Sequence, residues 1–187
     1  MLVSALMFVV ISMLRGINVS GHNLIRMDAL RELYASLKFE NARTYVQSGN
    51  VVFATRERDL QKMARRIEDA IEVRFACRPD VILRTVDEMR TVIARNPFPE
   101  DFHPSKLIVN FLASEPEKAA REKIRAIQVG PERLHLDGRE LYLYYPEGMG
   151  RSKLTPAVIE KAVKVRGTGR NWNSVRKLLE MAEDSSL

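Results

Sequence analysis

The chain has 187 residues, of which 45% are hydrophobic and 29% are charged, and 30 basic against 24 acidic side chains give a net charge of +6. The apolar and charged fractions lie near the averages of globular proteins, roughly 45–50% and 25%, which excludes a disordered or collagen-like chain. The single cysteine cannot form an internal disulfide, so a disulfide-stapled secreted scaffold is excluded and a reducing, cytoplasmic location is favoured.

The first fourteen residues are apolar apart from two serines. A membrane helix needs about 20 apolar residues. A secretory signal starts with basic residues and ends at a small-residue cleavage site, and this segment has neither. We therefore expect a long central strand here and no association with a membrane.

Patterns in the first half predict the order strand, helix, strand, strand, helix, strand over residues 1–85. Apolar residues at helical spacing predict helices over residues 27–37 and 60–71. The turn-like Ser48-Gly49 separates strands at 45–46 and 51–53, and a further strand follows at 81–83. This order is that of a ferredoxin-like plait.

The second half repeats strand, helix, hairpin, helix. Thr85 and Glu88 form a capping box for a linking helix that must end near Asn96, because Pro97 follows. After it we expect a strand at 107–112, a helix capped by a box at residues 114 and 117, a hairpin at 137–138, a helix from 155 and a last helix over 175–182. The fold class is therefore α+β, with two ferredoxin-like halves packed together, each with an antiparallel sheet: residues 1–96 with the linking helix, a Pro-rich connection at 97–104, and residues 105–187, a βαββα half with a C-terminal helix.

Two polar loops are expected at one edge of the first sheet. The first two strands of a plait run in the same direction, so the loop 15–26 and the turn 47–50 follow strand ends on the same side. An alternative interpretation is that their Asn, Gly and Ser residues serve only as turn formers and helix caps. The candidate ligand-binding side chains of these loops are Arg15, Asn18, Asn23, Gln47, Ser48 and Asn50.

The positive charge is concentrated near the C-terminus. Residues 146–177 hold eight basic and two acidic side chains, a net +6 that equals the charge of the whole chain. Such a local excess attracts anions, whether phosphate, nucleotide or nucleic acid. A solvated basic helix face is the simpler alternative.

Within this segment the sequence indicates a glycine-rich anion nest, with Gly150, Arg151, Ser152 and Lys153 as candidate ligand-binding residues. It lacks the spacing of a P-loop or of a dinucleotide fingerprint, and a plain connecting loop is the alternative. The other candidates here are Arg170, Asn171, Trp172 and Asn173, where an asparagine cap beside a buried indole competes with base stacking on the indole.

Five ordered motifs resemble the family called domain of unknown function 1697. They are Arg15-Gly16-Ile17-Asn18-Val19, Gln47-Ser48-Gly49-Asn50-Val51, Asn96-Pro97-Phe98-Pro99, Gly150-Arg151-Ser152-Lys153-Leu154 and Arg170-Asn171-Trp172-Asn173. The resemblance implies a small bacterial-type cytosolic protein with two ferredoxin-like halves, and it implies no activity. Ser20 departs from the family pattern, in which a second glycine is usual, and Gly167-Thr168-Gly169 stands where threonine or alanine is commoner.

No catalytic constellation and no metal-ligand spacing is present in the sequence, and we expect no metal and no cofactor. The first hypothesis for function is therefore binding, with or without turnover, of a small phosphate-bearing anion at one composite site. The loops at 15–23 and 47–50 and the region 150–173 would form that site together. Two alternatives stay open: a nucleic-acid-binding module that uses the basic region, and a protein-interaction or dimerisation module.

Overall fold

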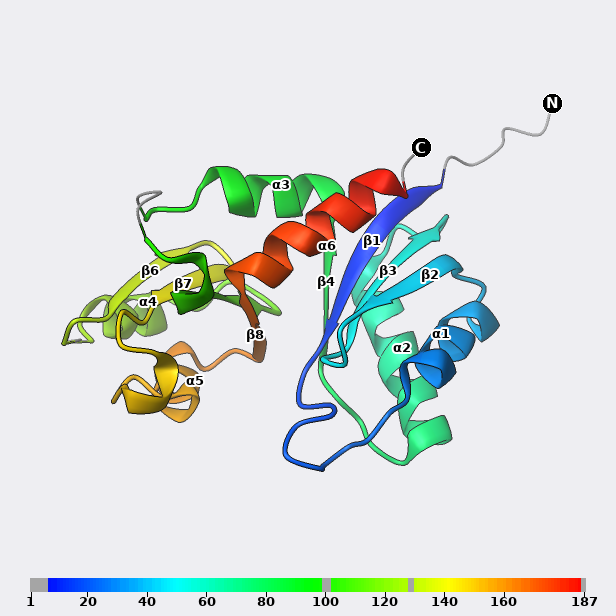
Figure 1. The fold of residues 1–187 in the computed structure, drawn as a ribbon, viewed down its shortest axis with the longest axis horizontal. Helices are drawn as coiled ribbons and strands as arrows, with labels where there is room; N and C mark the ends of the chain where they lie inside the picture. The colour runs from blue at the N-terminus through cyan, green and yellow to red at the C-terminus, as the bar shows by residue number, and fades with distance from the viewer. Residues whose placement is uncertain (1–6, 99–101, 128–129, 186–187) are drawn as a thin grey trace. The chain divides into compact units, whose positions relative to one another are not determined.

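The computed structural model of the chain describes residues 7–98, 102–127 and 130–185. Its contacts divide the chain into two units, Met1–Arg90 with Lys177–Leu187, and Thr91–Arg176. Each unit combines a four-stranded antiparallel sheet with helices (Figure 1). The predicted α+β class with two ferredoxin-like halves is confirmed. The Pro-rich connection expected at 97–104 falls in the second unit, and its residues 99–101 lie outside the described ranges.

The first unit is a ferredoxin-like plait. Its sheet has the order β2-β3-β1-β4, with β1 at the centre, as the apolar N-terminal run predicts. All its neighbouring strands are antiparallel, so β1 and β2 run in the same direction. Its elements are β1 (Phe8–Leu14), α1 (Met27–Ser36), β2 (Glu40–Tyr45), β3 (Asn50–Thr55), α2 (Leu60–Phe75), β4 (Val81–Thr85), the start of α3 (Val86–Ala94) and the end of α6 (Trp172–Asp184).

The core of this unit lies between the sheet and its two helices. Figure 1 shows α1 and α2 on one side of the sheet, where their apolar residues pack against alternate residues of the strands. Tyr34 of α1 is fully buried there, and its hydroxyl lies 2.7 Å from the hydroxyl of the equally buried Ser12 on β1. The Tyr34 ring packs edge-on against Phe53, with ring centres 5.2 Å apart. This buried polar pair is thus satisfied, as burial demands.

The last residues of α6 are fastened to the first unit by polar contacts. Arg43 of β2 donates hydrogen bonds to the carbonyl of Met181 and to the hydroxyl of Ser185. Arg90, in the middle of α3, pairs with Glu183 at 2.8 Å. These contacts join the end of α6, from Lys177 on, to the rest of the first unit.

The second unit repeats the plait. Its sheet has the order β6-β7-β5-β8, which is the order of the first sheet with each strand replaced by its counterpart. Its elements are the end of α3, the 3-10 turn η1 (Pro104–Lys106), β5 (Leu107–Leu112), α4 (Lys118–Arg125), β6 (Arg133–Asp137), β7 (Glu140–Tyr144), the 3-10 turn η2 (Met149–Arg151), α5 (Pro156–Val163), β8 (Gly167–Asn171) and the start of α6.

The register of the two sheets shows how closely the halves correspond. Arg84 of β4 lies opposite Ile11 of β1, and Arg170 of β8 lies opposite Val109 of β5. Each arginine is the last but one residue of its strand, and a helix follows directly in both cases. The two chain halves therefore share topology and strand register.

Three sequence predictions differ from the structure. The strand β8 was not predicted, because its sequence of glycines and polar residues lacks an apolar alternation. The capping box expected at Ser114 and Glu117 is wrong: Glu117 itself is the N-cap of α4, and it makes no side-chain cap hydrogen bond. Val46 was placed in the second strand, which instead ends at Tyr45, and Val46 is exposed with a left-handed backbone.

Candidate ligand site

The glycine-rich segment 148–154 forms a loop that is anchored by a buried tyrosine. Tyr145, at the end of β7, is 2% exposed, and its hydroxyl donates to the carbonyl of Leu154 at 3.0 Å. The amide of Gly148 donates to the carbonyl of Tyr145, and Gly148 has a left-handed φ of +88°. The Ser152 hydroxyl accepts from the Leu154 amide at 2.9 Å. Side-chain and backbone hydrogen bonds within the segment thus stabilise the conformation of the loop.

This loop borders a cavity of about 370 Å³ in the second unit. That volume lies within the range of small-molecule sites, roughly 300–1,000 Å³. The aliphatic side chains of Ile127, Pro131, Leu154 and Val158 supply the apolar part of the lining. The lining residues are Ile127, Gly130, Pro131, Glu132, Glu147, Gly148, Arg151, Ser152, Lys153, Leu154 and Val158.

Two cations of the lining have no acidic partner among the described residues. Arg151 and Lys153 are both exposed, and neither forms an ion pair within those residues. Of the predicted nest, Arg151, Ser152 and Lys153 line the cavity, whereas the exposed Gly150 of η2 does not. The cations are therefore available to a ligand at the cavity.

An acidic side chain of the same cavity is held in place. The Ser152 hydroxyl, and after it the backbone amides of Glu132 and Gly130, hold the pKa of the Glu132 carboxyl below its usual range. An added Cβ at Gly130 would lie 3.4 Å from Oε2 of Glu132, which shows how closely the carboxylate lies over this backbone. Ser152 consequently favours the ionised form of Glu132, while the Ser152 oxygen accepts from the Leu154 amide.

Sequence reasoning missed the acidic and apolar parts of this lining. Glu132 precedes β6 and Glu147 follows β7, so the antiparallel pairing of these strands brings the two together. The two acids are fifteen positions apart, and no motif links them. The available signal was the hairpin at Asp137-Gly138, because a hairpin places the residues that flank its two strands at one sheet edge.

The two polar loops of the first unit meet, as strand direction predicts. Nδ2 of Asn18 donates to the carbonyl of Gln47 at 2.9 Å, which ties the loop 15–26 to the turn 47–50. The same amide donates to the carbonyl of Ile25, while its oxygen accepts from the Ile25 amide at 2.8 Å. Asn23 donates to the carbonyl of Gly16 at 3.0 Å. Asn18 and Asn23 thus hold the loop conformation with their side chains.

The remaining candidates of these loops also have local contacts. Asn50 is fully buried and donates to the hydroxyl of Ser48 at 2.8 Å and to the carbonyl of Tyr45. Arg15 lies 3.5 Å from a carboxylate oxygen of Asp80. These contacts favour the alternative interpretation, in which the polar residues of the two loops stabilise the turns.

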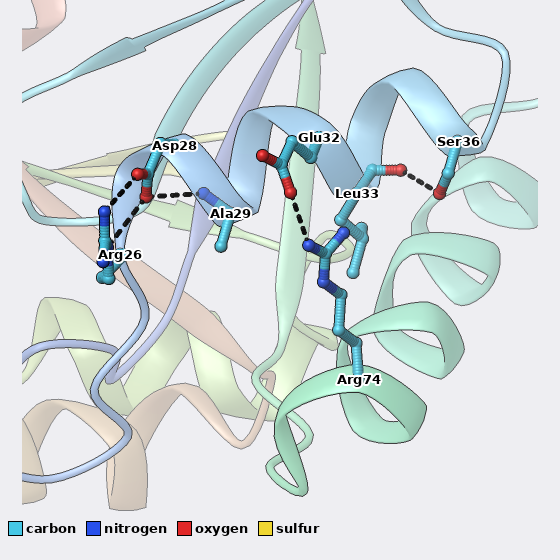
Figure 2. Close-up of polar contacts among 7 residues, drawn as sticks. All are labelled: Arg26, Asp28, Ala29, Glu32, Leu33, Ser36 and Arg74. Atoms are coloured by element: carbon cyan, nitrogen blue, oxygen red, sulfur yellow. Dashed lines mark hydrogen bonds and ion pairs between the residues drawn. The ribbon is translucent and has the colours of Figure 1, made fainter.

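A wider cavity of about 550 Å³ opens beside these loops, lined by Asn18, Leu24, Ile25, Arg26, Met27, Asp28, Arg31 and Gln47. Its charged residues are largely paired. Arg26 forms an ion pair with Asp28 at the start of α1, with a nitrogen to oxygen distance of 2.5 Å. Figure 2 shows the two side chains facing each other. Arg31 donates to the hydroxyl of Thr44 at 2.7 Å. Both arginines of this lining thus have a partner, whereas Arg151 and Lys153 in the cavity of the second unit have no acidic partner among the described residues.

The motif at 170–173 contributes no residue to the lining of the cavity in the second unit. Arg170 is 8% exposed, donates to the Thr168 hydroxyl at 2.7 Å, and has its pKa lowered to about 10 by burial. The side-chain oxygen of Asn171 accepts from the amide of Asn173 at 3.0 Å, and the Trp172 indole is buried. The asparagine cap and buried indole expected from the sequence are therefore present.

Arg15 and Asn50 belong to the first unit, and Gly150 and Arg170 belong to the second. The single composite site expected from the sequence stays a prediction.

Among the described residues, no three His, Cys, Asp or Glu side chains gather as a metal site would require. Over the same residues, no helix has the length and apolar character needed to cross a membrane. Cys77 lies between two arginines in the sequence, but burial raises the pKa of its thiol. It therefore lacks the lowered pKa of a reactive cysteine.

Comparison with known proteins identifies a family and a fold. No curated protein sequence matches the chain. A solved structure, that of the conserved bacterial protein SP0830 from Streptococcus pneumoniae, superposes with a TM-score of 0.76 at 18% identity, covering 95% of this chain and 99% of that one. At this identity the likeness concerns the fold. The model of a protein family of unknown function, DUF1697, matches residues 7–142, and the chain belongs to that family.

Proposed function

We propose that the protein binds a small phosphate-bearing molecule in the cavity beside Arg151 and Lys153. The observation that carries this proposal is the pair of exposed cations, without an acidic partner among the described residues, at the rim of a partly apolar cavity. Charged hydrogen bonds from an arginine and a lysine suit a phosphate dianion. The apolar lining from Leu154 and Val158 would receive the carbon skeleton of the ligand.

A thermal-shift screen of the full chain against nucleotides, sugar phosphates and small organic phosphates tests the proposal. A ligand at ten times its Kd adds about 1.4 kcal/mol to the free energy of unfolding, which raises the Tm of a chain of this size by roughly 3–6 °C. We expect the double variant Arg151→Ala/Lys153→Ala to lose this shift. Lys161→Ala is the matched control, because it removes an exposed cation of the same unit that does not line the cavity.

Nucleic-acid binding is the competing outcome. Six of the eight basic side chains at residues 146–177 are exposed, namely Arg151, Lys153, Lys161, Lys164, Arg166 and Arg176. A nucleic acid would contact several of them, so its affinity would fall steeply with salt and Lys161→Ala would weaken it as Arg151→Ala does. A cavity ligand would instead depend on Arg151 and Lys153 alone. Equal losses in both variants, or no shift with any phosphate, would contradict the proposed function.

A further inference from the structure

The cavity of the proposed function holds both signs of charge. Besides Arg151 and Lys153, its lining includes Glu132 and Glu147. A ligand that carried only a phosphate would bring its negative charges near two carboxylates, and like charges at close range oppose binding. The lining therefore suits a ligand with a positive group as well as a negative one.

The two carboxylates differ in how they are held. Glu132 lies close to the Gly130 backbone, and the Ser152 hydroxyl and neighbouring backbone amides favour its ionised form, which lowers its pKa. Glu147 is exposed and has no hydrogen bond or ion pair within the described residues. Two carboxylates in one lining can receive an ammonium group by charged hydrogen bonds.

The cavity lining also has an apolar part. Ile127, Pro131, Leu154 and Val158 contribute aliphatic surface to the same lining. A short carbon chain between the two charged ends of a ligand would contact this surface, and a volume of about 370 Å³ accommodates such a molecule.

We propose that the ligand is an aminoalkyl phosphate, whose phosphate binds Arg151 and Lys153 and whose ammonium binds Glu132 and Glu147. This inference rests on the proposed function, because it assigns the second recognition element of the same cavity.

Two probes that differ only in the amino group test the inference. O-phosphoethanolamine and ethyl phosphate are titrated into the ¹⁵N-labelled full chain near neutral pH, and the amide signals of Gly148 and Glu147 report binding. We expect O-phosphoethanolamine to bind about tenfold more tightly, because a charged hydrogen bond contributes to its affinity alone. In Glu147→Gln this preference should fall by roughly threefold, while the affinity for ethyl phosphate stays the same or rises.

The outcomes separate the two proposals. If both probes bind with equal affinity and Arg151→Ala weakens both, the ammonium inference is overturned and the proposed function stands. If neither probe binds, the ammonium inference is overturned, and the thermal-shift screen with nucleotides and sugar phosphates decides the proposed function separately. Glu147 is exposed, so its variant should fold. Glu132→Gln provides a second variant, whose lost preference would support the same conclusion even if Glu147→Gln altered the loop.

Discussion

Two glycines of the first unit share a left-handed backbone but differ in their surroundings. Gly49 has a φ of +71°, and an added Cβ would lie 2.8 Å from Cβ of Leu14 and 2.8 Å from Cδ1 of Ile17. Gly16 has a φ of +68°, and an added Cβ would have no heavy atom within 4 Å. Gly49 is thus required for space as well as conformation, because the turn and the end of β1 approach each other closely.

Substituting the two glycines separates these requirements. Gly16→Ala should cost about 1–2 kcal/mol of unfolding free energy, the cost of a left-handed backbone for an L-residue. Gly49→Ala should cost a further 1–3 kcal/mol, roughly, because the new methyl group overpacks the contact with Leu14 and Ile17. Urea unfolding of both variants measures the difference. Equal losses would show that the turn can move away from β1.

At the same scale, the sequence predicted where the polar residues of the first unit meet but not what they do. Strand direction was enough to bring Asn18 beside Gln47. Whether the Asn18 amide faces a ligand or the backbone depends on the exact path of the loop, which residue types alone do not determine. Ser20, at a position where the family pattern favours glycine, has a left-handed φ of +49°.

Among the elements, those with a strong periodic pattern were predicted and β8 was not. Gly167 begins this strand, and an added Cβ there would lie 2.8 Å from Cδ2 of Leu112 and 2.9 Å from the carbonyl oxygen of Phe111. The glycine that weakens the strand pattern is therefore needed for pairing with β5. For a related reason, only part of the cavity lining was predicted. Arg151, Ser152 and Lys153 belong to a local sequence motif, whereas Glu132 reaches the cavity only because β6 pairs with β7.

The start of α6 provides a prediction that separates a structural role from ligand binding. Asn171 caps the helix by accepting from the Asn173 amide, and its Nδ2 donates to the carbonyl of Ser105 at 2.8 Å. Asn171→Ala should cost about 1–2 kcal/mol of unfolding free energy through the lost cap. Asn171→Asp keeps the acceptor and should lose less.

Chemical denaturation of the two Asn171 variants measures these free energies. Titration with O-phosphoethanolamine, as above, measures their affinity for a phosphate-bearing ligand. We expect affinity to be unchanged in both, because Asn171 does not line the cavity. A variant that kept its stability and lost phosphate affinity would instead make Asn171 part of the site.

For the whole molecule, buried tyrosines and a buried arginine set the response to alkaline pH. Burial raises the pKa of Tyr145 to about 12 and raises those of Tyr34 and Tyr142 well above the ordinary value. Burial lowers the pKa of Arg170 to about 10. The tyrosines belong to both units, so the cores of both resist ionisation.

The signs of these shifts predict alkaline unfolding. Above about pH 10 an unfolded tyrosine loses its proton while the folded one keeps it, so the folded state binds more protons and stability falls as pH rises. Arg170 acts in the opposite direction, because its unfolded form keeps the proton longer. Three tyrosines against one arginine leave a net loss of roughly 1–3 kcal/mol per pH unit between about pH 10 and about pH 12.

Denaturant midpoints at rising pH, with tyrosinate absorbance recorded in the same samples, measure this loss. Tyrosinate should then appear together with unfolding. Tyr145→Phe removes one of the ionisable groups and should flatten the pH dependence, at the cost of its hydrogen bond to Leu154. Tyr144→Phe is the control, since Tyr144 is only half-buried and does not contribute to the raised pKa of Tyr142 or Tyr145. A midpoint that stays constant across this range would mean that the buried hydroxyls ionise without unfolding, which their burial in two separate cores opposes.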